Sequence, residues 1–320
     1  MESFSIWNLN NDRNFGQVIE IYQSYLNWRV TETDPYNDQT LEFSIEVIQN
    51  DDYAFLLNNA EENAISFAQV NYRREKVVTN ERNNPLRERR IKLIELTFFV
   101  FEYMGRVKFI SLRGSGANTL TALRAANNCT SNNEIVADNL EVTEDFFYWV
   151  FQRHMNFTNR ELYPGSNSFV DALTGYSGNT RDLVNNMWGR GNRISRILVT
   201  LAFLFNNDSL KSLTPDFKYG DENLEVELTL SGTFKFNEQS HVGRYFLEPD
   251  PIKKKACLLM LFVLEIFPNV KMAYNNHLED ETWGPDHQLN FIAGIGAEIQ
   301  DRVEEKLQGI RELLEDGDDE

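Results

Sequence analysis

Two of the four histidines in this 320-residue chain lie close together in a segment rich in carboxylates. Imidazole and carboxylate groups are common ligands of Mg, Mn and Zn ions. The candidate metal ligands are His277, Glu279, Asp280, Glu281 and His287. Because the two histidines are not four residues apart and Trp283-Gly284-Pro285 interrupts the segment, a solvated acidic loop is the competing interpretation. A metal site here would indicate a metal-dependent phosphodiester or nucleotide hydrolase that uses Mg or Mn.

A glycine-containing loop is the second place where chemistry could occur. Arg113, Gly114, Ser115 and Gly116 follow an apolar run at 107–112 and precede a predicted helix at 117–126. Such an arrangement can direct backbone N–H groups at a phosphate, and Arg113 would add positive charge. The chain lacks GxxxxGK[ST] and the third glycine of GxGxxG, so a tight capped turn competes with phosphate binding.

Positive charge is scarce in this chain and is concentrated in islands. The chain has 31 Lys and Arg against 49 Asp and Glu, a formal charge of −18. Residues 72–92 instead contain more basic than acidic residues. A second group of arginines, spaced by three at 190–196, would line one edge of a helix. The candidate nucleic-acid-binding residues are Arg73, Arg74, Arg87, Arg89, Arg90, Arg190, Arg193 and Arg196. Such islands can follow phosphates if they converge, whereas the competing interpretation pairs them with the abundant carboxylates.

The sequence patterns of several large enzyme classes are missing. GxSxG, HExxH and the protein-kinase motifs do not occur. Asp216-Phe217-Lys218 and Glu225-Val226-Glu227 contain pieces of a two-metal nuclease site, but not in the expected order. These patterns favour a protein without catalytic activity and without a cofactor.

Hydrophobic periodicity predicts the elements that must position these groups. Residues 15–30 have helical spacing, and residues 41–113 contain about five apolar runs joined by short polar connections, which indicates antiparallel strands. Helical patterns then follow at 117–126, 144–155, 193–205 and 251–267. The predicted class is α+β: an N-terminal antiparallel β-sheet with a flanking helix, and a mostly helical C-terminal half with an inserted hairpin at 223–237. The predicted domains are 1–126 and 144–320, with 127–143 as the boundary.

An amphipathic helix is predicted near the C-terminus, at 288–314, before an acidic tail. Ile292, Ile295, Ile299, Val303 and Leu307 begin its apolar stripe. Packing on its own domain competes with docking onto another protein, and a second copy of the chain, giving a homo-oligomer, is one such partner.

The cellular location follows from what the sequence lacks. The first 15 residues show no secretory signal, and the longest apolar runs have about a dozen residues where a membrane span needs about 20. Cys129 and Cys257 lie far apart, which favours free thiols. We therefore expect a cytoplasmic protein without a membrane segment.

Three functions remain open at this point. The first is a non-catalytic accessory protein of a bacterial or phage system, in phage defence or counter-defence, that binds another protein and DNA or RNA through its basic islands. Its bacterial or phage setting rests only on the motif-free, Asn-rich sequence. The alternatives are the metal-dependent hydrolase described above and an acidic protein that imitates nucleic acid in a partner's binding groove.

Overall fold

A computed structural model describes residues 1–29, 31–131, 133–157, 159–180, 185–191, 194, 197–206 and 209–317, with side chains up to residue 311. The chain divides into two compact units. Unit 1 comprises Met1–Glu141 and Ser231–Glu265, and unit 2 comprises Val142–Leu230 and Ile266–Glu320. Antiparallel strands and helices occur in the chain as predicted, which confirms the α+β class.

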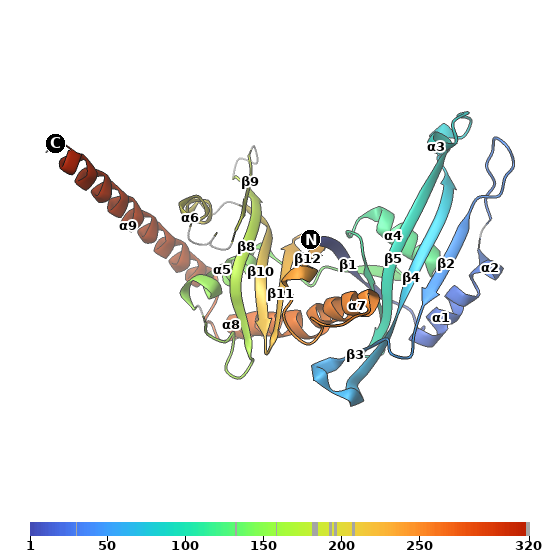
Figure 1. Cartoon of the computed structure of the whole chain (residues 1–320), viewed down its shortest axis with the longest axis horizontal. Coiled ribbons are helices and arrows are strands. Elements are labelled where there is room, and N and C mark those ends of the chain that lie inside the picture. The colour runs from blue at the N-terminus through green and yellow to red at the C-terminus, as the bar shows by residue number, and fades with distance from the viewer. Residues whose placement is uncertain are drawn as a thin grey trace. The chain divides into compact units, whose positions relative to one another are not determined.

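Unit 1 is built on an antiparallel sheet (Figure 1). Its strands are β1 (Glu2–Leu9), β2 (Phe43–Ile48), β3 (Ala54–Leu56), β4 (Ala64–Val77), β5 (Ile91–Tyr103), β6 (Arg106–Ser111), β7 (Ile135–Asp138) and β12 (Phe234–Phe236). The strand order is β2-β4-β5-β6-β1-β12, while β3 pairs with β4 and β7 pairs with β1. Strand β2 therefore lies at one end of this order.

Several helices accompany this sheet. They include α1 (Phe15–Gln23), α2 (Tyr25–Trp28), α3 (Arg87–Arg90), α4 (Ala117–Ala126) and α7 (Pro251–Leu261), with short 3-10 turns at Leu57–Asn59, Glu61–Asn63, Thr79–Glu81 and Glu238–Ser240. A capping box between Asn14 and Gln17 starts α1, because each side chain accepts a hydrogen bond from the other residue's backbone N–H. Tyr22 of α1 and Leu123 of α4 belong to one buried cluster with Phe98 of β5. The sheet face that carries Phe98 is thereby removed from water.

Unit 2 combines a four-stranded antiparallel arrangement with long helices. Its strands are β8 (Ser168–Asn179), β9 (Asn186–Arg190), β10 (Ser209–Tyr219) and β11 (Glu222–Thr229), in the order β11-β10-β8-β9. Its helices are α5 (Glu144–Asn156), α6 (Leu198–Phe205), α8 (Phe267–Glu279) and α9 (Pro285–Gly317). The Thr143 hydroxyl caps α5 by accepting from the backbone N–H of Phe146. The ring of Phe146 packs edge-on against that of Tyr274 in α8.

One continuous helical stretch, Pro251–Glu279, joins α7, a π-helical segment (Phe262–Ile266) and α8. In the part of the chain that is described, it is the one helix long and apolar enough to cross a membrane. Its apolar window is mostly buried within the protein. Such burial is typical of the core helix of a soluble protein.

Candidate anion-binding site

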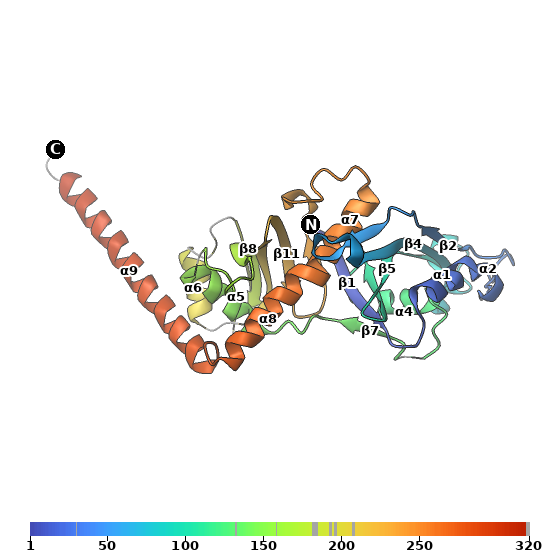
Figure 2. The same cartoon turned by 90° about the horizontal axis from the view of Figure 1, so that it is seen from below.

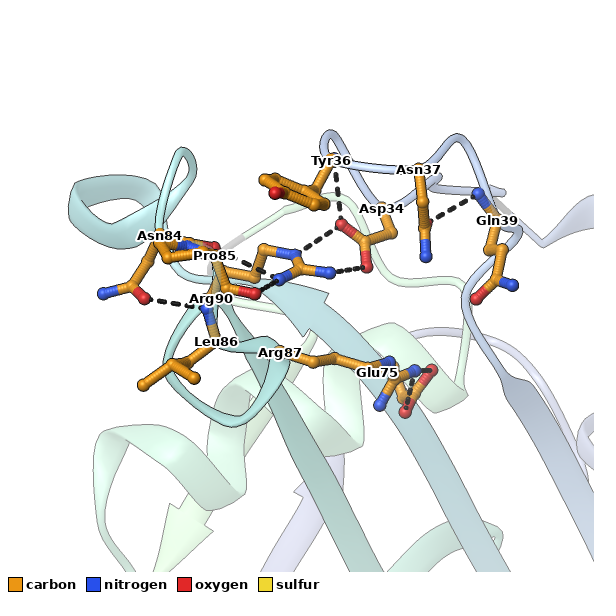
Figure 3. A network of polar contacts seen from close by, with 10 residues as sticks. All are labelled: Asp34, Tyr36, Asn37, Gln39, Glu75, Asn84, Pro85, Leu86, Arg87 and Arg90. Atoms are coloured by element: carbon orange, nitrogen blue, oxygen red, sulfur yellow. Dashed lines mark hydrogen bonds and ion pairs between the residues drawn. The ribbon is translucent and has the colours of Figure 1, made fainter.

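The β4–β5 hairpin ends in a loop that is fixed by a buried ion pair (Figure 3). Two guanidinium nitrogens of Arg90 donate to the two carboxylate oxygens of Asp34, each at 2.7 Å. A third donates to the backbone carbonyls of Asn84 and Pro85, and the ring of Tyr36 lies 4.7 Å from the guanidinium carbon. The hydrogen bonds from Arg90 hold the pKa of Asp34 below its ordinary value. Arg90 therefore stabilises the loop and is not exposed to a ligand.

Other arginines of the 72–92 island also pair with carboxylates. Arg87 donates to both carboxylate oxygens of Glu75 at 2.8 Å (Figure 3). Arg74 pairs with Glu32, and Arg73 lies between two acidic side chains, at 3.7 Å from Glu95 and 3.8 Å from Glu42. Arg89 is exposed, and within the described residues it has no ion-pair partner. Four of the five arginines predicted in this island are thus engaged by acidic side chains.

Two cations of the island that no carboxylate engages, Lys76 and Lys92, meet Arg113 around one pocket. Lys76 of β4 and Lys92 of β5 are direct cross-strand partners. Together with Arg113 they line a pocket of about 360 Å³ whose other walls include Asn118 and Thr121 of α4. All lining residues are neutral or basic. Within the described part of the chain, none of the three cations has an ion-pair partner. The structure therefore brings two sequence features, the basic island and the glycine loop, to one site.

The glycine loop holds the backbone of Arg113 in place. The Ser5 hydroxyl donates to the carbonyl of Arg113 at 2.7 Å. The backbone N–H of Ser115 donates to the hydroxyl of Thr233 at 3.0 Å, so this predicted phosphate donor already has a partner. A Cβ atom on Gly114 would lie 3.0 Å from the same hydroxyl oxygen, a tight contact that would require the Thr233 side chain to shift. Of the four residues predicted in this loop, only Arg113 lines the pocket.

The charge of this pocket is unfavourable unless an anion enters it. Like charges directly opposite each other on neighbouring strands are destabilising by about 0.2–1 kcal/mol. Lys76 and Lys92 form such a pair, and Arg113 adds a third positive charge. An anion would reduce the repulsion of all three groups at once. The pocket can thus bind a phosphate or carboxylate, and the lining holds no carboxylate that would serve as a general base.

The predicted metal ligands are distributed over α8, the following turn and α9. His277 lies in α8, and its Nδ1 accepts a hydrogen bond from the indole N–H of Trp149 at 3.1 Å. Burial, assisted by the charge of Arg153, lowers the pKa of His277 and keeps its ring neutral. Glu279 ends α8, Asp280 and Glu281 follow it, and His287 lies in the first turn of α9. Among the described residues, no three His, Cys, Asp or Glu side chains are arranged to hold a metal ion. The Mg or Mn hydrolase stays a prediction.

Of the second group of arginines, Arg190, Arg193 and Arg196, only Arg190 lies within the described residues. Arg190 is exposed in strand β9, so the expectation of a helix edge is wrong at this residue, because the chain pairs with β8 there. Arg193 and Arg196 lie outside the described residues.

Asp216 and Glu225, which belong to the segments that contain pieces of a nuclease site, form part of an acidic cluster that spans three strands of unit 2. Asp216 of β10 is the register partner of Glu225 in β11 and of Ala172 in β8, next to Asp171. Burial first, and then the charges of Asp171 and Glu225, raise the pKa of Asp216 to about 7. Asn223 donates to its carboxylate at 3.0 Å.

The predicted C-terminal helix is α9, and its two halves differ in burial. Ile295 is buried, and Gly296 approaches the ring of Phe205 in α6 so closely that a Cβ atom would lie 2.6 Å from a ring carbon. Further along, α9 extends away from the other elements of unit 2 (Figures 1 and 2), and the apolar side chains Val303, Leu307 and Ile310 are exposed. Docking of another protein or a second copy on this stripe stays a prediction.

Comparison with known proteins adds no relative to this picture: no family model matches the chain, and no curated protein is significantly similar to it.

Proposed function

We propose that the protein is a non-catalytic nucleic-acid-binding protein that holds phosphate groups in the pocket of Lys76, Lys92 and Arg113. The observation that carries this proposal is the gathering of three cations, without a lining carboxylate, in a chain whose net charge is −18. Random placement of charge in so acidic a chain would put carboxylates beside these cations, as it does for the other arginines of the same island.

The surroundings of the pocket favour a polyanion over a small carboxylate ligand. The hairpin loop beside the pocket carries two further exposed cations, Arg82 and Arg89. They extend positive charge beyond the pocket, which suits a chain of phosphates. Contacts of this kind position a nucleic acid backbone without reading its bases. We therefore expect binding with little sequence preference. A role in phage defence or counter-defence stays a prediction from composition alone.

The test is a binding titration with a charge-matched control. A short fluorescein-labelled single-stranded DNA is titrated with the unsubstituted chain and with the triple variant Lys76→Ala/Lys92→Ala/Arg113→Ala, and anisotropy is measured at low salt. The pocket lysines and Arg113 are proposed to make the phosphate contacts, so their loss is expected to abolish binding.

The control removes the same charge elsewhere. Arg106 follows the opposite end of β5, and Lys211 and Lys218 are exposed on β10. The variant Arg106→Ala/Lys211→Ala/Lys218→Ala is expected to keep its affinity within about twofold, because none of these three cations lines the pocket. Equal weakening by both triple variants would show a general charge effect and contradict a specific pocket.

A further inference from the structure

Strand β2 leaves one edge of the unit 1 sheet open. Within the described chain it pairs only with β4, and it stands at the end of the strand order. Its sequence, FSIEVI, is rich in β-branched and aromatic residues. Natural sheets block such edges with lysine, proline or a bulge. None of these interrupts β2, whose one charged residue, Glu46, accepts a hydrogen bond from Asn71 on β4.

The hydrogen-bond pattern shows which backbone groups face outward. The backbone N–H of Glu75 donates to the carbonyl of Glu42 at 2.9 Å, and these residues continue the β2–β4 register by one position. In an antiparallel pair, alternate residues form the hydrogen bonds. Ser44 and Glu46 therefore bond to β4, while Ile45 and Val47 direct their N–H and C=O groups to the open edge. In the described residues nothing hydrogen-bonds to these outward groups.

The carbonyl of Phe43, which also lies on this edge, accepts a hydrogen bond from a side chain of the same chain. A guanidinium nitrogen of Arg29 donates to the carbonyl of Phe43 at 3.3 Å. Phe43 has the same parity as Ile45 and Val47, so its carbonyl also faces outward. The side chain of Arg29 thus ends the open edge at Phe43.

A groove lined by aromatic, apolar and polar side chains runs beside the open edge. Its volume is about 860 Å³, and it lies between α1–α2 and β2. Ile45 and Val47 line it together with Tyr22, Tyr25 and Leu26. Leu26 is 69% exposed although it borders this groove. An extended chain bonded to Ile45 and Val47 would place alternate side chains against these residues, because side chains alternate along a strand.

Negative charge marks one end of the groove. Asp51 lines it just beyond β2, and Asp52 follows in the same exposed turn. Within the described residues neither carboxylate has an ion-pair partner. A lysine or arginine of an occupant would find its counter-charge here.

We propose that β2 binds an extended segment of another protein by strand addition, with apolar side chains at alternate positions in the groove and a basic side chain at Asp51. Backbone hydrogen bonds to Ile45 and Val47 supply the orientation, and the groove supplies the selectivity. This surface is separate from the pocket of Lys76, Lys92 and Arg113, so either proposal can fail alone.

The test is a selection from a phage-displayed library of short random peptides on the full chain, compared with the variant Val47→Pro. Proline removes the outward N–H of residue 47 without removing a bond to β4, so the sheet is expected to persist. The variant Val47→Thr keeps the N–H and serves as the control. Enriched peptides are expected to alternate apolar residues, to contain Lys or Arg, and to lose at least tenfold in affinity for Val47→Pro but not for Val47→Thr.

Two further variants keep the test decisive if proline disturbs folding. Leu26→Glu changes an exposed side chain and is expected to abolish binding of the selected peptides, and Asp51→Lys is expected to reverse the preference from basic to acidic peptides. The proposal is overturned if no peptides are enriched on the unsubstituted chain, or if the enriched peptides bind Leu26→Glu as tightly as the unsubstituted chain.

Hydrogen exchange distinguishes a peptide from a second copy. In the free chain the amides of Ile45 and Val47 are expected to exchange fast while that of Glu46 is protected, and a selected peptide is expected to slow the two fast amides at least tenfold. Protection of Ile45 and Val47 that grows with protein concentration alone would show that another copy occupies the edge, and would overturn the peptide proposal.

Discussion

The salt dependence of nucleic acid binding is a quantitative consequence of the pocket. Each cation that neutralises a phosphate of single-stranded DNA releases counterions and contributes about −0.7 to the slope of log K against log salt concentration. Three cations, Lys76, Lys92 and Arg113, line the pocket. They should contribute a slope of about −2.1, so a fourfold rise in salt should weaken their part of the binding about 18-fold.

The assay repeats the anisotropy titration between about 50 and 200 mM KCl, where this relation holds. Replacing Lys92 alone by alanine should make the slope less negative by about 0.7, and replacing Lys92 and Arg113 together should make it less negative by about 1.4. The variant Arg106→Ala/Lys211→Ala/Lys218→Ala should keep the slope of the unsubstituted chain. A slope that the pocket substitutions leave unchanged would refute the assignment of phosphate contacts to these three residues.

Three predictions concern the stability of the two units. Lys92→Thr should raise the free energy of unfolding by about 0.5 kcal/mol while it weakens DNA binding, because it removes the repulsion from Lys76; urea unfolding that shows a loss of stability would contradict this. Asp216 has a pKa of about 7 in the folded chain and an ordinary value of 3.8. The Asp216 carboxyl therefore loses its proton at a lower pH in the unfolded chain than in the folded chain, so the free energy of unfolding should fall as the pH rises from about 4 to about 7. A tenfold difference in proton affinity between the folded and unfolded chain corresponds to about 1.4 kcal/mol, and this effect is reduced here because solvent reaches the side chain. Between about pH 4 and about pH 7, the free energy of unfolding of Asp216→Asn should therefore rise by about 2 kcal/mol relative to that of the unsubstituted chain. Equal pH profiles in thermal melts would contradict the cause assigned to the raised pKa. Gly294→Ala should stabilise by about 1 kcal/mol through helix propensity, since its Cβ meets open space, whereas Gly296→Ala should show no gain, because the phenylalanine ring of α6 must move; the same gain in both variants would show that this packing is unimportant.

Local sequence signals were sufficient to predict those helices and strands whose contacts are with residues near in sequence. Helix α4 occupies the predicted residues 117–126, because its apolar spacing and the preceding glycine loop mark its start. The long β4–β5 hairpin follows alternating patterns in consecutive runs, and its partners are near in sequence.

Strands with distant partners did not show in the sequence pattern. Strand β1 has four consecutive buried residues, so it lacks the alternation of a half-exposed strand, and its partners β6, β7 and β12 lie about a hundred residues away or more. Strand β8 contains glycines that indicate a loop. One of them, Gly178, is required by packing, because a Cβ atom there would clash with the ring of Phe203 in α6.

The candidate site was predictable in its parts but not as a whole. Lys76, Lys92 and Arg113 all belong to segments whose positive charge the sequence singles out. Their convergence depends on the exact register of β4 with β5 and on the position of α4, which are set by side-chain packing over the whole sheet. The arginines that looked most suitable for nucleic acid are mostly held by carboxylates from other strands and loops, contacts that only the folded chain creates.

Lysine acylation with and without saturating single-stranded DNA, read out by mass spectrometry, tests the proposed pocket most directly. We expect bound DNA to protect Lys76 and Lys92 several-fold, while the exposed Lys211 and Lys218 of β10 react at unchanged rates. Bound DNA that leaves Lys76 and Lys92 fully reactive would contradict the proposal that these lysines hold its phosphates.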